Sequence, residues 1–595
     1  MKKNTLFAIS VSALLSCTAC NNSGPINYGY GKERSRFSDK IDQVWVERGV
    51  DEYQINTGNT PEVLEAAKDE MMKIYGKNKL MVSSYDPSLA FTTPYGTYVG
   101  KKDNNNIVSW KGVPYAKAPI KDLRWKTPQK LDESNDVYQA YYFGSSSIQC
   151  VSFDEPSSLY PQGEDCLNIN IWNNQTDTST NKPIMVWIHG GAYIQGGTSD
   201  TVYEGTNIVK NNPEVIYASI DYRTDFLGFV NFSDVPGGDK YKESANLGLL
   251  DQVAALAWLK ENASSFGGDP NRITIFGESA GGGSTSALTI MPSAKGLFKR
   301  AIVQSGSSSN FLRTAEKSKA QTQKILDICG AKNMNELLEL TAKDIEKIAT
   351  ILGVEGTATY TYPQLDGITL PLDIKKSLEG DARDGIDILG GTTKDEYEYW
   401  THIMTQEENK KTMVGALANF TTRMTSDELS RYNQFRDKLT GSPYRIDIQT
   451  INYLSFHAPS RFEARTHAKN GGKVYQYLFT EEVNDGYINS ETGEYQGYGS
   501  FHGAELPFLF GNITDNMPLS CTIEEANELS ITMQKMWVNF ALTGNPSTSS
   551  IPWNPYTLQD DKVMIINAKG CAQENDPLRE NIDLMGDVYW AKLRS

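Results

Sequence analysis

The pattern Gly-x-Ser-x-Gly occupies residues 277–281, with Ser279 at its centre. It directly follows a strand-like run that ends at Phe276, and it precedes a stretch of small residues, 282–288, that can open a helix. A tight turn from strand to helix leaves no room for side chains at the two glycines, and it pushes the serine into a strained, exposed position. We therefore predict that Ser279 is a nucleophile; a glycine-rich turn that merely contains a serine is the alternative.

A serine that attacks a carbonyl group needs backbone N–H donors for the oxyanion that forms. Gly190 and Gly191 follow the strand-like run Ile184–Ile188, and without side chains they let the backbone approach the reacting atoms. The N–H group of Ala280, next to the nucleophile, is the third candidate donor. Losing one such donor typically costs about 3 to 4 kcal/mol of transition-state stabilisation. A flexible glycine connection is the alternative interpretation of Gly190 and Gly191.

The base that accepts the serine proton is chosen from five histidines, which are His189, His402, His457, His467 and His502. The first belongs to the glycine motif, and the next three lie in ordinary charged or helical surroundings, where a solvated or hydrogen-bonded histidine is the usual outcome. His502 lies in the loop 501–507 and comes last in the order serine, acid, histidine that enzymes with such a turn use. We predict that His502 is the base.

The acid that orients the base has two candidates on one loop. Asp395 and Glu396 follow the strand-like run Ile386–Leu389, which places both carboxylates at the C-terminal end of a strand. Either one would hold the imidazole and stabilise its charged form. Position alone does not separate the two.

Composition and charge narrow the class of protein. Of the 595 residues, 39% are hydrophobic, which excludes a disordered chain, and the net charge of −16 argues against nonspecific binding to nucleic acid. None of the seven cysteines has the spacing of a zinc site, so a metal cofactor is not indicated. Short β-branched runs alternate with helical patterns between Ile184 and Phe276, which predicts a largely parallel sheet covered by helices.

Residues 1–20 contain two lysines, an apolar run and a small-residue region, which is the layout of a secretory signal. Their tail resembles a bacterial lipobox with Cys17 or Cys20 as the lipidated residue, and an ordinary signal peptide is the alternative. We expect residues 21–92 to form an extension with a tether and a short helix, Pro61–Tyr75, and residues 93–595 to form the catalytic domain. The expected location is the bacterial cell envelope, lipid-anchored, or the periplasm or extracellular space.

At these motifs the sequence resembles the type-B carboxylesterase/cholinesterase family of α/β-hydrolases, in particular its bacterial para-nitrobenzyl-esterase-like members. The resemblance covers roughly residues 93–590 in unbroken order. Its landmarks are residues 276–282, 164–172, 112–116, 246–252, 266–270, 304–306 and 543–546. The implied fold is an α/β-hydrolase fold, in which helices flank a large, mostly parallel central sheet, with a small antiparallel region near the N-terminus.

The resemblance selects Glu396 as the acid, because the family places its acidic residue in a Lys-Asp-Glu-Gly segment. This chain carries Tyr397 where the family usually has glycine, so Asp395 stays as the fallback. The resemblance also implies a disulfide between Cys150 and Cys166, worth roughly 3 kcal/mol on the loop-entropy model. Cholinesterases of this family carry a choline-binding tryptophan in a longer version of the loop between these cysteines. This chain has no tryptophan there, so the resemblance implies that choline esters are not the substrates.

The implied function is that of a serine carboxylesterase acting on small-molecule esters. Ser279 would attack the ester carbonyl, His502 would accept and then return the proton, and Glu396 would hold the imidazole. The N–H groups of Gly190, Gly191 and Ala280 would bind the oxyanion. Water would hydrolyse the acyl-enzyme, so no metal or organic cofactor is required.

The competing interpretations are a catalytically inactive binding protein, and a lipase or amidase on the same fold. We expect packing or hydrogen-bonding roles for Glu278 and Ser305 nearby.

Overall fold

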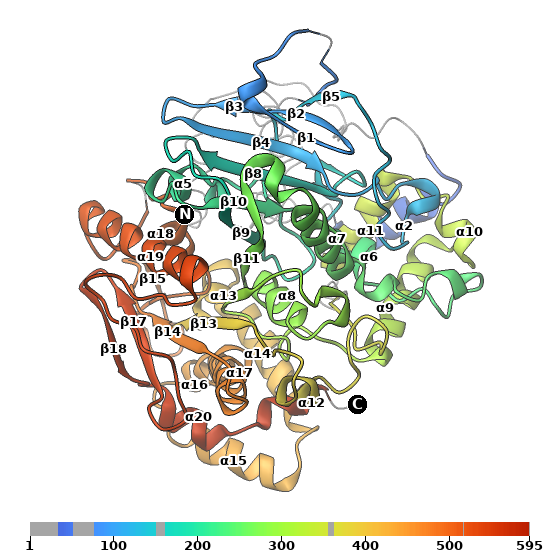
Figure 1. Cartoon of the computed structure of the whole chain (residues 1–595). Coiled ribbons are helices and arrows are strands. Elements are labelled where there is room, and N and C mark those ends of the chain that lie inside the picture. Colours follow the sequence, from blue (N-terminus) through green and yellow to red (C-terminus); the bar gives the residue numbers. More distant parts are fainter. Residues whose placement is uncertain are drawn as a thin grey trace, which may run out of the picture. The chain divides into compact units, whose positions relative to one another are not determined.

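The computed structural model describes residues 34–50, 77–81, 83–149, 161–354, 362–515 and 517–593 (Figure 1). The side chains of residues 315–317, 402, 403, 592 and 593 are outside this description. The predicted signal segment, both candidate lipidation sites, the predicted helix at residues 61–75 and Cys150 also lie outside the described residues. The chain divides into two compact units, one of residues up to 271 with 315–372, the other of residues 272–314 with 373–595.

The first unit contains a short hairpin and a larger group of paired strands. Its strands are β1 (Ala90–Thr93), β2 (Gly96–Val99), β3 (Lys101–Lys102), β4 (Ile107–Pro114), β5 (Val137–Gln139), β6 (Ser146–Ser147), β7 (Gln162–Gly163), β8 (Asn168–Asn174), β9 (Lys182–Ile188) and β10 (Ile216–Ile220). Strands β3, β4, β8, β10 and β9 lie side by side in that order. Strand β8 is antiparallel to both neighbours, whereas β9 and β10 are parallel. Every residue of β9 and β10 is buried, which explains their continuous apolar runs.

Helices of the first unit include one near the N-terminus that the sequence analysis missed. They are α2 (Ser38–Glu47), α5 (Thr206–Asn211), α6 (Asp225–Gly228), α7 (Leu247–Asn262), α9 (Ala315–Cys329), α10 (Met334–Leu337) and α11 (Ala342–Val354). Helix α2 lies beside α11 (Figure 1), where Ser38 Oγ donates to Asp344 Oδ1 over 2.7 Å and Lys347 pairs with Asp42. Its Ile41 joins the apolar core of this unit. Part of the predicted extension is therefore built into the first unit.

The second unit contains most of β11 and the parallel strands that follow it. Its strands are β11 (Gly268–Glu278), β12 (Arg300–Gln304), β13 (Asp387–Thr393), β14 (Val474–Phe479), β15 (Gly486–Ile488), β16 (Tyr495–Gly497), β17 (Lys562–Asn567) and β18 (Gly570–Asn575). Strands β11, β12, β13, β14 and β17 pair in parallel in that order. Strand β18 adds an antiparallel edge, which is red in Figure 1.

Helices of the second unit follow nearly every strand. They are α8 (Ala280–Leu288), α12 (Ile374–Glu379), α13 (Glu398–Ile403), α14 (Gln406–Thr421), α15 (Ser426–Arg436), α16 (Pro443–Asn452), the π-helix η10 (Tyr453–His457), α17 (Ala458–Lys469), α18 (Leu506–Phe510), α19 (Ile523–Thr543) and α20 (Arg579–Met585). None of the helices in the described part of the chain has the length and apolar character that crossing a membrane requires. The predicted strands at residues 184–188 and 386–389, and the strand predicted to end at Phe276, are confirmed within a few residues at their ends.

Candidate active site

Ser279 occupies the turn between β11, which ends at Glu278, and α8, which begins at Ala280. Its backbone has φ 57° and ψ −123°, a conformation that is strained for a residue with a side chain. The neighbouring backbone holds this turn, because Ser279 N–H donates to the carbonyl of Gln304 over 3.0 Å and the N–H of Gly283 donates to the carbonyl of Ser279 over 2.8 Å. The strand, turn and helix that the sequence predicted around Ser279 are therefore present.

His502 and Glu396 form a short hydrogen bond. His502 Nδ1 lies 2.5 Å from Glu396 Oε2, and the backbone N–H of His502 donates to the carbonyl of Glu396 over 3.1 Å. The second carboxylate oxygen, Oε1, accepts from the N–H of Thr393 at the end of β13 over 3.0 Å. The Glu396 side chain is fully buried, so these bonds fix both the carboxylate and the imidazole.

Asp395, the other candidate acid, has a different role in the structure. Its Oδ2 accepts from the N–H of Ser500 over 3.0 Å, and the N–H of Asp395 donates to the carbonyl of Ser500 over 2.9 Å. Asp395 thus ties its loop to the segment before His502. Of the two candidate acids, the structure brings Glu396 to the imidazole.

Two further glutamates surround the same imidazole. Glu278 Oε1 lies 3.2 Å from His502 Nε2, and the buried Glu505 accepts from Gln304 Nε2 over 3.1 Å. Burial alone would lower the pKa of His502, but the charges of Glu278, Glu396 and Glu505 outweigh it and raise that pKa to about 9. Burial, together with the charge of Glu396, raises the pKa of Glu505 to about 7. We call Glu278, Glu396, His502 and Glu505 the acid–base cluster.

Aromatic side chains cover the imidazole of His502. Trp400 of α13 stacks on it with ring centroids 5.3 Å apart, and Phe456 of the π-helix η10 approaches to 4.9 Å. The ring of Tyr399 lies 6.2 Å away, edge to face. Such contacts restrict the rotation of the imidazole and keep water from its faces. Sequence reasoning missed these residues, because nothing in their local pattern relates them to His502.

Gly190 and Gly191 follow β9 and begin a loop, His189–Thr198, that we call the oxyanion loop. Gly191 has φ +96°, and a Cβ atom there would lie 2.2 Å from the carbonyl oxygen of Gln195, so only glycine fits. Among the described residues, the N–H groups of Gly190 and Gly191 donate to no acceptor. Gly190 is buried and Gly191 is half-buried, and buried N–H groups rarely lack a partner, so these two are available to a ligand.

Ala280 is the first residue of α8, in the second unit. The N–H groups of the first residues of a helix have no partner within the helix. The N–H group of Ala280 is therefore also available to an oxyanion at the end of the helix where negative charge is favoured.

The predicted disulfide between Cys150 and Cys166 is absent from the structure. Cys166 is a buried free cysteine, and burial raises the pKa of its thiol well above the usual value, which favours the neutral form. Cys150 itself lies outside the described residues. Cys329, Cys521 and Cys571 are also free.

The remaining histidines contact backbone or hydroxyl groups. His189 Nδ1 lies 2.9 Å from the carbonyl of Gly190, His457 Nδ1 lies 3.0 Å from Thr392 Oγ1, and His467 Nε2 lies 3.0 Å from the carbonyl of Ile386. Burial lowers the pKa of each of them to about 4. The side chain of His402 is outside the described residues. Within the described part of the chain, no three His, Cys, Asp or Glu side chains gather as they would around a metal ion.

Comparison with known proteins gives concordant matches. The model of the carboxylesterase family matches residues 88–585. The para-nitrobenzyl esterase of Bacillus subtilis (strain 168) is 34% identical over 502 residues, which cover 82% of this chain and 96% of that protein. An acetylcholinesterase of Leptinotarsa decemlineata is 30% identical over 555 residues, covering 81% and 86%. Among solved structures, a Geobacillus stearothermophilus carboxylesterase matches with a TM-score of 0.72 and 32% identity, and the match covers 84% of this chain and all of that one.

Proposed function

The chain belongs to the carboxylesterase family and has the α/β-hydrolase fold, and from that premise we propose that it hydrolyses carboxylic esters with Ser279, His502 and Glu396 as its catalytic triad. The observation that carries this assignment is the buried bond of 2.5 Å between His502 Nδ1 and Glu396 Oε2. It fixes the tautomer of the imidazole with its proton on Nδ1, so that Nε2 is the atom that can accept a proton from a nucleophile.

In the first step, Ser279 Oγ attacks the ester carbonyl while His502 Nε2 takes the serine proton. The imidazolium that forms is held by Glu396 and returns the proton to the leaving alcohol, which yields an acyl-enzyme. Water then repeats the sequence, and the acid leaves with Ser279 restored. No metal or organic cofactor takes part in these steps.

The oxyanion of each tetrahedral intermediate binds to the N–H groups of Gly190, Gly191 and Ala280. The free N–H groups of the oxyanion loop and the free first turn of α8 support this assignment. Backbone strain at Ser279 supports its role as the nucleophile, because a non-glycine residue with a backbone in the left-handed region indicates a functional position.

The acid–base cluster sets the pH at which this reaction runs. The neighbouring carboxylates raise the pKa of His502 to about 9 against the effect of burial. At neutral pH the resting side chain is therefore the imidazolium, with protons on both ring nitrogens. The same carboxylates stabilise the imidazolium that forms when Ser279 attacks. The enzyme therefore gains activity as the pH rises toward 9, because only the neutral imidazole accepts a proton.

The substrates we propose are carboxylic esters of uncharged alcohols. The absence of tryptophan between Cys150 and Cys166 in the sequence argues against a site for choline. The para-nitrobenzyl esterase of Bacillus subtilis is named for an ester of an uncharged alcohol, which is consistent with this proposal.

Export is a further part of the proposal, and it rests on the sequence alone. Residues 1–20 have the layout of a secretory signal, with Cys17 or Cys20 as the site of a lipid anchor in the bacterial cell envelope. Expression of the full chain with radiolabelled palmitate tests the anchor. Label that is lost in only one of Cys17→Ala and Cys20→Ala identifies the residue; label in neither the wild type nor the variants contradicts lipidation.

The triad is tested by comparing the wild type with Ser279→Ala on short, medium and long p-nitrophenyl esters and by labelling with a fluorophosphonate. We expect turnover and labelling in the wild type and neither in Ser279→Ala. The matched control is Ser284→Ala, in the same helix five residues later, which should keep both. A folded wild-type protein that hydrolyses no ester and takes no label would contradict the assignment and favour a binding role.

A further inference from the structure

The oxyanion loop has an unusual backbone. Ala192 and Tyr193 are consecutive residues with side chains, and both lie in the left-handed region, with φ 54° and 61°. They directly follow the free N–H groups of Gly190 and Gly191. Non-glycine residues persist in such conformations only where the surrounding structure fixes them. Within the loop, the N–H groups of Ile194 and Gln195 each donate to the carbonyl of Gly191 over 3.0 Å, and groups outside the loop hold the rest of it.

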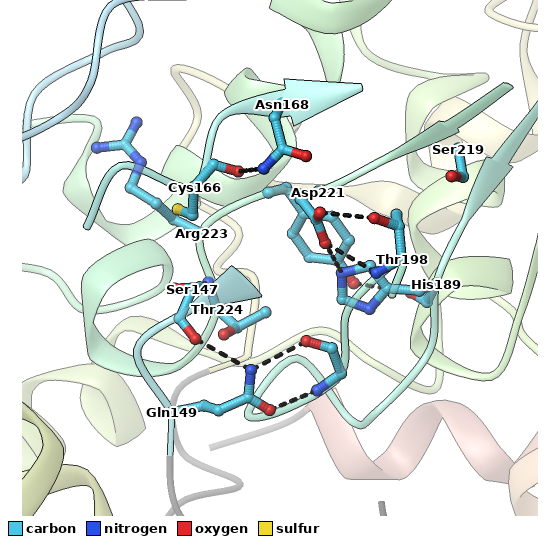
Figure 2. A network of polar contacts seen from close by, with 12 residues as sticks. Ser147, Gln149, Cys166, Asn168, His189, Thr198, Ser219, Asp221, Arg223 and Thr224 are labelled. Carbon is cyan, nitrogen blue, oxygen red and sulfur yellow. Dashed lines mark hydrogen bonds and ion pairs between the residues drawn. The ribbon is translucent and has the colours of Figure 1, made fainter. Parts of the chain in front are cut away.

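Gln149 holds one point of the loop with its side-chain amide. Its Oε1 accepts from the N–H of Gly196 over 2.7 Å, and its Nε2 donates to the carbonyl of the same residue over 3.0 Å (Figure 2). Nε2 also donates to the carbonyl of Ser147 over 3.0 Å, which fixes the amide plane. A single buried side chain thus satisfies both backbone groups of Gly196, which has φ +107°.

Asp221 holds the loop two residues later. Its Oδ1 accepts from the N–H of Thr198 over 2.9 Å and its Oδ2 from the hydroxyl of Thr198 over 2.6 Å (Figure 2). Asn170 of β8 donates to the same hydroxyl over 2.8 Å. Thr198 is therefore bound through its backbone and its side chain at once.

The register of the sheet explains why Asp221 is placed to do this. Ile188, the last residue of β9, pairs with Ile220, the last residue of β10, so Asp221 emerges beside His189 at the same edge. Strand pairing fixes the start of the oxyanion loop, and Asp221 draws its end back to the same edge. Tyr222 adds a bond from its hydroxyl to the carbonyl of His189 over 2.8 Å.

Little space remains around this closed loop. A Cβ atom at Gly196 would lie 2.6 Å from His189 Nδ1, and one at Gly197 would lie 2.1 Å from Ser146 Oγ. Gly196 and Gly197 therefore let the loop pack closely against its surroundings, and a side chain at either position would displace it.

We propose that Gln149 and Asp221 are positioning residues of the proposed oxyanion hole: by holding Gly196 and Thr198 they keep the strained loop closed and fix the direction of the N–H groups of Gly190 and Gly191. This inference rests on the proposed esterase function. Neither side chain touches the substrate, and both act through the backbone of the loop.

Two variants remove the holding bonds, and each is paired with a second variant at the same position. Gln149→Met removes the donor and the acceptor at nearly constant size, whereas Gln149→Glu keeps an acceptor for the N–H of Gly196. Asp221→Leu removes both acceptors, whereas Asp221→Asn keeps one and has a shape like the carboxyl. Burial raises the pKa of Asp221 to about 7, so its neutral form, which Asn resembles, is already accessible near neutral pH.

The readouts are kcat and KM for p-nitrophenyl acetate, the inhibition constant of an aliphatic trifluoromethyl ketone, and the thermal unfolding midpoint. The ketone adds Ser279 Oγ to its carbonyl and forms a stable hemiketal oxyanion, so its affinity reports the oxyanion hole. Loss of one donor costs about 10²- to 10³-fold in kcat, and we expect displaced donors to cost about 10- to 100-fold.

The matched control is Asn174→Leu. Asn174 is a buried residue at the end of β8, where its side chain donates to the carbonyl of Val209 over 3.0 Å and accepts from the N–H of Thr176 over 2.9 Å. The register places Asn174 beside the start of β10, whereas the oxyanion loop lies beside the end of β10. It should lower the unfolding midpoint without changing kcat.

We expect Gln149→Met and Asp221→Leu to lower kcat and to raise the inhibition constant of the ketone by the same factor, with KM nearly unchanged. Asp221→Asn should keep most of the activity. Gln149→Glu should lose at least as much as Gln149→Met, because a carboxylate oxygen would replace Nε2 and face the carbonyls of Gly196 and Ser147. If Gln149→Met or Asp221→Leu does not fold, kcat, the inhibition constant of the ketone and the unfolding midpoint are compared in Gln149→Glu and Asp221→Asn instead.

The inference is wrong if the folded variants match Asn174→Leu, with a lower unfolding midpoint but unchanged kcat and ketone affinity. A wild-type protein that hydrolyses no ester would instead contradict the proposed function, and the inference with it.

Discussion

The acid–base cluster and the oxyanion loop are built on opposite principles. In the cluster, three carboxylates surround one imidazole, and the pKa of His502 rises to about 9 because their charges outweigh its burial. In the oxyanion loop the important groups are neutral backbone N–H groups, and their direction is set by glycines, left-handed residues and the bonds to Gln149 and Asp221. The acid–base cluster sets the protonation of His502, and the oxyanion loop sets the direction of the N–H groups of Gly190 and Gly191.

This difference predicts how each region fails. A change of charge in the acid–base cluster leaves the backbone in place and alters a tautomer or a pKa. A change of shape in the oxyanion loop moves the donors and also releases strain, which is about 1 to 3 kcal/mol for each non-glycine residue in the left-handed region. Variants of the cluster should therefore change the pH dependence of activity and, through the same pKa, the pH dependence of stability, whereas variants of the loop should change activity and stability at every pH.

The largest effect is expected for Glu396→Gln. The amide cannot hold the imidazolium or fix its tautomer, and the equivalent change in a serine protease triad lowers kcat by about 10⁴. We expect a loss of about 10³- to 10⁴-fold in kcat.

Asp395→Asn is the matched control for that variant, because Asp395 is the adjacent carboxylate and bonds to Ser500 rather than to the imidazole. We expect its kcat to stay within about tenfold, since only the loop contact weakens. Equal losses in the two variants would contradict the assignment of Glu396 as the acid. Both are measured by steady-state hydrolysis of p-nitrophenyl acetate.

Gly191→Ala tests the oxyanion loop in the same way. A Cβ atom at this position meets the carbonyl of Gln195 at 2.2 Å, so the loop must shift and carry its N–H groups with it. We expect a loss of about 10²- to 10³-fold in kcat together with a lower unfolding midpoint.

Gly296→Ala is the control for backbone strain without a clash. Gly296 has φ +79°, and no atom lies within 4 Å of the Cβ that would be added. It should cost about 1 to 2 kcal/mol of stability and leave kcat unchanged. If Gly191→Ala kept wild-type activity, the N–H of Gly191 would not be an oxyanion donor.

The two regions also differ in how far the sequence could predict them. Ser279 and the two glycines of the oxyanion loop follow strands whose apolar runs are clear, and His502 stands out because the chain has so few histidines. The resemblance to the family was needed to choose Glu396, since Asp395 has the same position relative to β13. Residue type and strand order thus supplied the reacting groups.

What the sequence could not supply is the set of residues that hold those groups. Gln149 lies 47 residues before Gly196, and Glu505 and Trp400 have ordinary neighbours, so no local pattern connects any of them to the site. Helix α2 was missed for the same reason, because its bonds to Asp344 and Lys347 join segments about 300 residues apart. Long-range contacts of this kind depend on the completed fold and not on local periodicity.

The charges of the acid–base cluster raise the pKa of His502. Glu278→Gln removes a carboxylate whose oxygen lies 3.2 Å from His502 Nε2. Because the charge of Glu278 raises the pKa of His502, its removal lowers that pKa, and neutral imidazole then exists at lower pH. The ascending limb of kcat/KM should therefore move to lower pH by about one pH unit, which gives about tenfold more activity at pH 7.

The pH profile of kcat/KM from pH 5 to 10 checks this shift. Wild-type kcat/KM should rise until the pH passes about 9, the pKa of His502, and then level off. Glu482→Gln is a suitable control, because Glu482 is an exposed carboxylate that pairs with Lys394. An ascending limb that stays in place in Glu278→Gln would show that the charge of Glu278 does not act on the imidazole.

The smallest effect is expected for Tyr222→Phe in the region of the oxyanion loop. The variant removes the bond of 2.8 Å to the carbonyl of His189 and keeps the ring that stacks on the His189 imidazole, with centroids 4.3 Å apart. The loss of one buried hydrogen bond should cost about 1 to 2 kcal/mol of stability. Because Gln149 and Asp221 still hold Gly196 and Thr198, kcat should stay within about threefold. Chemical unfolding and steady-state kinetics measure the two quantities on the same preparation. A large loss of kcat in Tyr222→Phe, with little effect in Gln149→Met, would mean that the loop is held at its start by Tyr222 and not at its end.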